Sequence, residues 1–321
     1  MNIVPTSFER IMPDHLQNFA VSIFRKAGMS EMDATLLSDA LVDGDLRGVF
    51  SHGTRLIEGY LPLLIDRNLN PAPDPKVIGE TDNSINVDGD GGLGYFASFM
   101  AIRMCVQKAK KTGMAVGITS NHGHFGSAGH YTRKAIEAGC FGLAMSSHHR
   151  EFSPEQSILK ASGASPICMG APAGDQPPLI IDMATGGNRA DEFFNEIPAT
   201  YFKMLGLGLM SNALGGILSG MVTREETGVG AWKGVNQGAF FLVVDIARLT
   251  DMEVFRRQMD DFITSLRKMK PPPGHEHTET PGGLEHERTL SWREEGIPIG
   301  EQHLAVLEKA GKEMDVSLPW D

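Results

Sequence analysis

Three histidines and three glycines lie within eleven residues, Asn121 to Tyr131, in the stretch NHGHFGSAGHY. An apolar run, Met114 to Thr119, precedes this stretch and is predicted to form a buried strand. Imidazole is the side chain whose ordinary pKa lies closest to neutral pH, and glycines let a backbone turn tightly beside a ligand. The stretch is therefore predicted to be a loop suited to proton transfer.

A second group of reactive side chains lies upstream in RGVFSHG, Arg47 to Gly53. Ser51 could hydrogen-bond a substrate oxygen, and Arg47 or Arg55 could bind a carboxylate through two parallel hydrogen bonds. His52 is then a second candidate acid or base. The alternative is a plain helix junction, with Ser51 as a cap and the histidine on the surface. Together the two groups predict a site for a small anionic molecule that carries a carbonyl.

Histidine-rich loops can also bind metals. The spacings among His122, His124 and His130, without a nearby carboxylate, match no standard zinc or iron ligand pattern. His275 and His277, in the segment GHEHTE, are typical of a solvated loop. No metal site is predicted, and a metal-dependent lyase or hydrolase is a lesser alternative.

The stretch GDGGLG, Gly89 to Gly94, matches the dinucleotide-binding pattern G-x-G-x-x-G between a predicted strand and a predicted helix. A Rossmann turn also needs an acidic residue about twenty positions further on to bind the ribose. No Asp or Glu occurs between Asp90 and Glu137. A tight structural turn is therefore favoured here, and a nicotinamide cofactor would bind elsewhere.

Two further charged residues lie where ligands commonly bind. Asp182 ends the apolar run at the start of LIIDMAT (Leu179 to Thr185), and Leu179 to Asp182 is predicted to be a buried strand. A carboxylate at the end of such a strand can orient a histidine. Lys203 precedes a long uncharged helix, where an ammonium could reach a phosphate or carboxylate, or could simply extend to solvent.

The elements that must position these residues follow from periodicity. Apolar residues at helical spacing predict helices in the first seventy residues, with Ser30 as the N-cap of the second. After the break at Pro71 to Pro75, strand-like runs alternate with helices as far as the strand Phe240 to Asp245. This alternation is typical of α/β proteins. Lys270 to Gly283 is predicted to be a long loop because of its prolines and glycines.

Two regions result. Residues 1–75 are predicted to be a helical substrate or dimer segment, joined by residues 284–321 from the end of the chain. Residues 76–283 are predicted to be an α/β cofactor-binding region.

Composition narrows the functional class. A net charge of -11 argues against binding to nucleic acid or to an anionic membrane. The odd number of cysteines and the lack of a secretory signal at the start predict a reduced protein in the cytoplasm. One membrane-like stretch, Met204 to Thr223, contains polar residues and glycines, and is predicted to be a buried, closely packed helix.

Five motifs in order then resemble one known family, the second-type malate/L-lactate dehydrogenases. They are RGVFSHG, HFGSAGHY (His124 to Tyr131), LIIDMAT, the Lys203 helix ending in LSG, and GIPI (Gly296 to Ile299). The resemblance implies a non-Rossmann α/β fold with a helical N-terminal segment and a central mixed-sheet cofactor domain, assembled as a homodimer. It implies hydride transfer between NAD or NADP and a small 2-oxo acid or cyclic imino acid.

The same resemblance implies roles for individual residues. His52 and His124 become the acid/base candidates, and Asp182 the aspartate that supports the catalytic histidine. The substrate would be bound by Arg47, Ser51 and Arg55. The cofactor would be bound by Ser146, Ser147, Asp182, Met183, Ala184, Thr185, Lys203, Pro281, Gly282 and Gly283.

The chain also departs from the family pattern. The usual G-T-N-P turn reads GASP at Gly163 to Pro166, the late P-G-E turn reads Pro-Gly-Gly, and Met204 replaces a usual glycine. Arg55 stands one position early, and the segment after Asp182 is short. These departures support a second hypothesis, a non-catalytic ligand-binding or assembly homologue on the same scaffold.

Overall fold

The computed structural model describes residues 3–163, 165–186, 190–221 and 232–320. The chain divides into two compact units, which are described separately. The first contains Met1–Pro73, Trp232–Gly234 and Gly283–Asp321, and the second contains Asp74–Ala231 and Val235–Gly282. The sequence placed these boundaries after residues 75 and 283.

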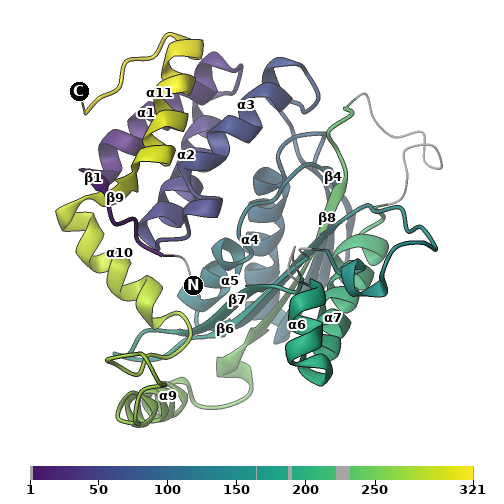
Figure 1. The fold of residues 1–321 in the computed structure, drawn as a ribbon. Helices are drawn as coiled ribbons and strands as arrows, with labels where there is room; N and C mark the ends of the chain where they lie inside the picture. Colours follow the sequence, from purple (N-terminus) through teal and green to yellow (C-terminus); the bar gives the residue numbers. More distant parts are fainter. Residues whose placement is uncertain (1–2, 164, 187–189, 222–231, 321) are drawn as a thin grey trace. The chain divides into compact units, whose positions relative to one another are not determined.

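The first unit is built from helices and a two-stranded antiparallel sheet (Figure 1). Its strands pair Ile11 with Ile297, both buried, so the C-terminal part of the chain is joined to the N-terminal helices. Ser30 caps the second helix as predicted, since its Oγ accepts a hydrogen bond from Asp33 N at 3.1 Å. The elements are β1 (Phe8–Ile11), α1 (Pro13–Lys26), α2 (Glu31–Leu46), η1 (Phe50–His52), η2 (Thr54–Leu56), α3 (Ile57–Ile65), α10 (Gly283–Glu295), β9 (Ile297–Gly300) and α11 (Glu301–Met314).

The second unit is built on a seven-stranded sheet with the order β2-β3-β4-β8-β5-β6-β7. Only β3 and β4 pair in parallel among the described strands, so the sheet is mixed, as predicted. Its strands are β2 (Lys76–Glu80), β3 (Ser84–Asp88), β4 (Met114–His122), β5 (Cys140–His148), β6 (Pro166–Ala171), β7 (Leu179–Ala184) and β8 (Gln237–Asp245).

Helices cover both faces of this sheet. A Cβ on Gly142 of β5 would lie 2.8 Å from Ala135 of α5, whereas Ser147 of the same strand hydrogen-bonds Asn212 of α7 at 3.0 Å. Side chains alternate along a strand, so an even and an odd position point to opposite faces. The helices are α4 (Gly94–Thr112), α5 (Gly129–Glu137), α6 (Ala190–Glu196), α7 (Pro198–Asn212), its π-helical continuation η4 (Ala213–Leu218), and α9 (Met252–Arg267).

The prediction of a buried helix at Met204 to Thr223 is wrong for one of its faces; residues 222 and 223 lie outside the described part. Gly208, Ser211 and Gly215 are buried, and a Cβ on Gly215 would lie 2.9 Å from Ser146 Cα. The small residues let α7 and η4 approach the sheet closely; Leu205 is also buried, whereas most of the other large apolar side chains of this stretch are exposed. Ile217 is 70% exposed. No helix in the described part is long and apolar enough to cross a membrane.

The strand predicted at Leu179 to Asp182 is present as β7, but it is not buried as expected. Only Ile180 is buried, and Ile181 is 43% exposed. The reason is its place in the sheet, since among the described strands β7 is the last and pairs with β6 alone. Beside it, Ile180 N donates a hydrogen bond to Pro281 O at 3.0 Å.

Candidate active-site segments

In the first unit, the SHG turn (Ser51 to Gly53) and the residues on either side of it include four of the predicted site residues. Ser51 Oγ lies 3.0 Å from His52 Nδ1, so the serine hydrogen-bonds the imidazole that follows it. Arg47 ends α2, and its Nε donates to Asp43 Oδ1 at 3.0 Å. Arg55 is exposed on η2. Of the two arginines, Arg55 is thus the better placed to bind a carboxylate from solution, because Arg47 already has an ion pair on its own helix.

In the histidine loop of the second unit, His122 is fully buried at the end of β4. Its Nδ1 lies 2.7 Å from Gly123 O, and its Nε2 lies 2.9 Å from Thr119 Oγ1. A carbonyl oxygen can only accept, so Nδ1 carries the proton and Nε2 accepts from the threonine. Burial lowers the pKa of His122 to about 4. This histidine is therefore neutral at pH 7 and supplies no proton as an imidazolium.

His130 is also a structural residue of this loop. It is 4% exposed on α5, and its Nδ1 accepts a hydrogen bond from Arg133 Nη2 at 3.1 Å. Its ring packs beside Tyr131. His124, by contrast, is only half-buried, and its carbonyl accepts from Gly94 N at 3.0 Å. Burial separates the three loop histidines, and His124 is the one with access to solvent.

The glycine turn Gly89 to Gly94 supports this loop. Gly89 N and Gly91 N donate to Ser120 O and Asn121 O, both at 2.9 Å. A Cβ on Gly94 would lie only 2.5 Å from His122 Nδ1, so a side chain there would displace the histidine. These backbone N–H groups, which a bound pyrophosphate would need, instead donate hydrogen bonds to carbonyl groups of the protein. The structural interpretation of this turn is confirmed.

Asp182 joins β7 to the histidine loop. Its Oδ2 accepts from Ser127 Oγ at 2.7 Å and from Gly129 N at 2.9 Å, at the N-terminus of α5. A carboxylate is stabilised there by the helix dipole and by the N–H groups of the first turn. The structure thus brings LIIDMAT to HFGSAGHY. Sequence reasoning missed Ser127, although a serine just before a predicted helix is a recognised capping signal.

The PGG turn also lies along β7. Pro281 O accepts from Ile180 N, two residues from Asp182, and Gly282 has φ +89. A Cβ on Gly282 would lie 3.1 Å from Ile180 Cβ. Glycine is thus favoured by both the backbone conformation and the close approach. Pro281, Gly282 and Asp182 are therefore near neighbours in the second unit.

Three of the hydroxyl groups predicted to bind the cofactor already have protein partners. Ser146 Oγ donates to Gly238 O at 2.8 Å, and Thr185 Oγ1 donates to Ser165 O at 2.6 Å. Ser147 Oγ lies 3.0 Å from Ser165 Oγ. All three predicted residues are at most 2% exposed. Their hydroxyls hold the sheet and its neighbouring turn together, and cofactor binding by these residues stays a prediction.

The remaining predicted groups fit a dinucleotide better. Lys203 is exposed on α7, where its ammonium could bind a phosphate, and Ala184 is exposed on β7. Because β7 is an edge strand and Ile180 N points away from β6, the main-chain groups of Ala184, four residues further on, also face away from the ladder. The Lys203 ammonium and the main-chain groups of β7 thus suit a molecule that has anionic phosphates and amide groups.

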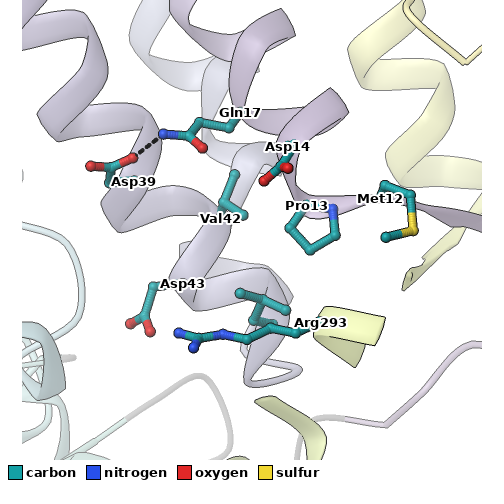
Figure 2. A pocket seen from close by; sticks show the side chains of 9 residues that line it. Met12, Pro13, Asp14, Gln17, Asp39, Val42, Asp43 and Arg293 are labelled. Atoms are coloured by element: carbon teal, nitrogen blue, oxygen red, sulfur yellow. Dashed lines mark hydrogen bonds between the residues drawn. The ribbon is translucent and has the colours of Figure 1, made fainter. Parts of the chain in front are cut away.

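A cavity of about 400 Å³ lies in the first unit among α1, α2 and α10 (Figure 2). None of the predicted site residues lines it. Its lining mixes apolar and polar side chains: Gln17 is hydrogen-bonded to Asp39, and Arg293 lies near Asp43. Asp43 also pairs with Arg47, which lies four residues before Ser51. The full lining is Met12, Pro13, Asp14, Gln17, Asp39, Val42, Asp43, Leu46 and Arg293.

Across the described residues, no group of three or more His, Cys, Asp or Glu side chains could hold a metal ion.

Comparison with known proteins identifies a family. The family model described as malate/L-lactate dehydrogenase matches residues 11–190 and 189–308. Malate dehydrogenase of Pyrococcus horikoshii is 31% identical over 356 residues, with 98% of each chain covered. L-sulfolactate dehydrogenase of Methanocaldococcus jannaschii is 26% identical, with 96% of this chain and 98% of the relative covered. The solved structure of the Pyrococcus horikoshii malate dehydrogenase superposes with a TM-score of 0.85 at 29% identity, covering 99% of both chains.

The alignments also locate a difference. The alignment to the Pyrococcus horikoshii enzyme spans 356 positions, whereas this chain has 321 residues, so the relative has residues that this chain lacks. The family match is divided into two ranges that meet at residues 189–190, four residues after LIIDMAT ends at Thr185. This supports the prediction that the segment after Asp182 is short. Apart from this difference, the family model matches nearly the whole length of this chain. The chain therefore belongs to the malate/L-lactate dehydrogenase family.

Proposed function

We propose that this protein transfers a hydride between NAD or NADP and C2 of a small 2-oxo or 2-hydroxy acid, or of a cyclic imino acid. The observation that carries the proposal is the match of a dehydrogenase family over most of the chain. The relatives are named for malate and L-sulfolactate, two small hydroxy acids. The exposed cation Arg55 beside Ser51 and His52 is the kind of group that such anionic substrates need.

Proton transfer is assigned to His124, with His52 as the second candidate. When bound, the reduced nicotinamide supplies the hydride, and the substrate oxygen or nitrogen must then take up a proton. An imidazolium can supply that proton near neutral pH. His122 is excluded because both its ring nitrogens are engaged and its pKa is lowered to about 4. Asp182 would act by holding the loop through Ser127 and Gly129.

The substrate and cofactor are assigned to separate sets of residues. Arg55 would bind the substrate carboxylate, with Arg47 and Ser51 contributing further hydrogen bonds. The β7 segment and Lys203 would hold the cofactor, together with the PGG turn that is hydrogen-bonded to β7.

The direct test is the oxidation of NADH and of NADPH, followed by absorbance, with a panel of 2-oxo acids and cyclic imino acids. We expect turnover with at least one acid, and a variant Arg55→Ala in which KM for that acid rises far more than kcat falls. Arg67→Ala, which changes another arginine of the same unit outside the SHG turn, is the control. A folded protein that oxidises neither cofactor with any acid would contradict the proposal.

One observation favours a second candidate function, a non-catalytic ligand-binding or assembly homologue. The Pyrococcus horikoshii enzyme has residues that this chain lacks, and the split of the family match at residues 189–190 supports placing the missing segment after LIIDMAT, where part of the cofactor site is predicted. A protein that keeps the scaffold but has lost this wall would bind the cofactor weakly. Binding and turnover must therefore be measured separately.

We also propose a homodimer located in the cytoplasm. The dimer rests on the family resemblance. The compartment is supported by Cys105, Cys140 and Cys168, which are all buried and free of disulfide bonds, as expected for a reduced protein.

A further inference from the structure

A buried chain of polar groups lies behind the SHG turn. Asp45 of α2 is fully buried, and its Oδ2 accepts two hydrogen bonds from Thr54, from N at 2.8 Å and from Oγ1 at 2.7 Å. Thr54 Oγ1 also lies 2.9 Å from Nε2 of His303, which is 6% exposed on α11. The three residues come from α2, η2 and α11, all within the first unit.

The chemistry of the three groups fixes the order of the protons. An ionised carboxylate can only accept, so the single hydroxyl proton of Thr54 is donated to Asp45. Thr54 Oγ1 must then accept from His303, which therefore carries its proton on Nε2. Burial, with Arg55 nearby, lowers the pKa of His303 to about 4, so this imidazole is neutral at pH 7. When Asp45 is ionised, the chain therefore runs in one direction, from His303 through Thr54 to Asp45.

This chain packs directly against the turn. A Cβ on Gly53 would lie 1.7 Å from Asp45 Oδ1, and a Cβ on Gly44 would lie 2.7 Å from His52 O. The two glycines therefore let the carboxyl group and the backbone of the turn approach closely. Thr54 directly follows Gly53, so its two hydrogen bonds hold the end of the SHG turn onto α2.

The arrangement is costly for stability alone. Neither Asp45 Oδ1 nor His303 Nδ1 makes a hydrogen bond within the described part of the chain. A buried carboxyl group with so few donors destabilises the fold, and an apolar side chain of similar size would pack there at less cost. The cost indicates a role beyond packing. Burial raises the pKa of Asp45 to about 7, despite the bonds from Thr54.

Charged and titratable groups lie on α2 and on four elements packed near the SHG turn. They are Asp43 and Arg47 on α2, His52 on η1, Arg55 on η2, His303 on α11, and Arg288 on α10, whose guanidinium lies against Gly48. Within the described part of the chain, Thr54 is the only residue that donates a hydrogen bond to this carboxyl group.

Building on the proposed function, we propose that Asp45 and His303 are positioning residues of the substrate site, acting through Thr54 to hold the turn that carries His52 and Arg55. Neither residue touches the substrate in this proposal. Sequence reasoning missed both. Asp45 lies among mostly buried residues of α2, and His303 is 249 residues away from Thr54 in the sequence.

The first test removes the hydroxyl that links the chain. Thr54→Val keeps the shape of the side chain but cannot bond Asp45 or His303 through Oγ1, and we expect kcat/KM for the acid to fall about tenfold, mainly through KM. Thr54→Ser keeps the hydroxyl and should restore most of the loss. His303→Gln, whose amide can still donate to Thr54, should be milder than His303→Leu. The dissociation constant for the cofactor alone should not change in any variant.

The second test uses pH. Asp45 ionises as the pH rises through about 7, and the proton order described above holds only above that value. The profile of kcat/KM should therefore contain a step near neutrality, with the higher value on the alkaline side. Asp45→Asn keeps an acceptor oxygen for Thr54 but cannot ionise, so its profile should lack this step. A merely structural role for Asp45 would lower activity equally at every pH.

The third readout does not depend on turnover. Nitrogen-15 NMR of histidine-labelled protein should show the proton of His303 on Nε2, and Thr54→Val should shift the ring signals of both His303 and His52. Unchanged His52 signals together with unchanged kcat/KM in Thr54→Val would overturn the proposal. If the unaltered protein oxidises neither cofactor while the His52 signals still move, the proposed function fails and the positioning of the turn is supported. If Thr54→Val does not fold, His303→Leu against His303→Gln decides in its place.

Discussion

His122 and His124 are two residues apart, yet their environments are opposite. The strand β4 ends at His122, where Thr119 and the carbonyl of Gly123 engage both ring nitrogens in a fully buried site. His124 lies beyond the end of the strand and is half-buried. The sequence shows that both are histidines in a glycine-rich loop. It does not show their burial, because that depends on the close approach of Gly89 and Gly94 from another segment.

The role of His124 leads to a prediction for His124→Gln. Glutamine keeps hydrogen-bonding capacity but cannot donate a proton from a cationic ring, so kcat should fall about a hundredfold or more if His124 is the proton donor. KM and the affinity for the cofactor should change little. Steady-state kinetics with an acid that proves to be a substrate in the panel assay provide the measurement.

His277→Gln is the matched control, since His277 is 89% exposed in a loop outside the proposed site. It should behave like the unaltered protein. Near-normal turnover in His124→Gln would move the role to His52, and His52→Gln should then show the large loss.

At the scale of elements, α9 restrains the connection between β6 and β7. The carboxylate of Asp260 accepts backbone hydrogen bonds from Gly174, Asp175 and Gln176 at 2.9, 2.9 and 3.0 Å. These bonds hold the pKa of Asp260 below its ordinary value, although burial acts in the opposite direction. The connection leads into β7, which carries Asp182. The helix therefore contributes to the placement of the histidine loop without touching it.

We expect Asp260→Asn to loosen this connection. An amide has one acceptor oxygen in place of two and turns N–H groups toward backbone N–H groups, so at least one of the three bonds is lost. The free energy of unfolding should fall by about 1 kcal/mol, a modest value because the site is open to solvent. Hydrogen exchange should show faster exchange at the amides of residues 174–176.

Asp261→Asn provides the control. Asp261 is the next residue on the same helix and is exposed, and its substitution removes the same charge. It should leave both the exchange rates and the stability unchanged. Equal effects from the two variants would show that net charge, and not the backbone bonds of Asp260, is responsible.

At the scale of the whole molecule, local and non-local features differ in how well the sequence predicts them. Periodicity is local, so the strands predicted at Met114 to Thr119 and Phe141 to Ser146 are present as β4 and β5, extended by a few residues. Strand order is not local: β8 lies between β4 and β5, although it follows both in the sequence by many residues. The contacts of Asp182 with Ser127 and Gly129 depend on that order. The candidate residues were thus predictable from motifs, but their hydrogen bonds were not.

The family match with its break at residues 189–190 makes cofactor binding the decisive property of the whole chain. A cofactor that binds only the folded protein raises its stability by mass action, by about 2.7 kcal/mol when its concentration is a hundred times Kd. We expect NADH or NADPH to raise the melting temperature, measured by differential scanning fluorimetry, and the cofactor with the larger shift to be the one oxidised. Lys203→Gln should reduce that shift by weakening phosphate binding, whereas Lys111→Gln, an exposed lysine at the end of α4, should not. If neither NADH nor NADPH at millimolar concentration raises the melting temperature, the non-catalytic homologue is favoured. The protein would then have lost its cofactor site together with the missing segment. A shift without turnover would instead place the loss in the substrate site, at His52, Arg55 or the buried chain behind them.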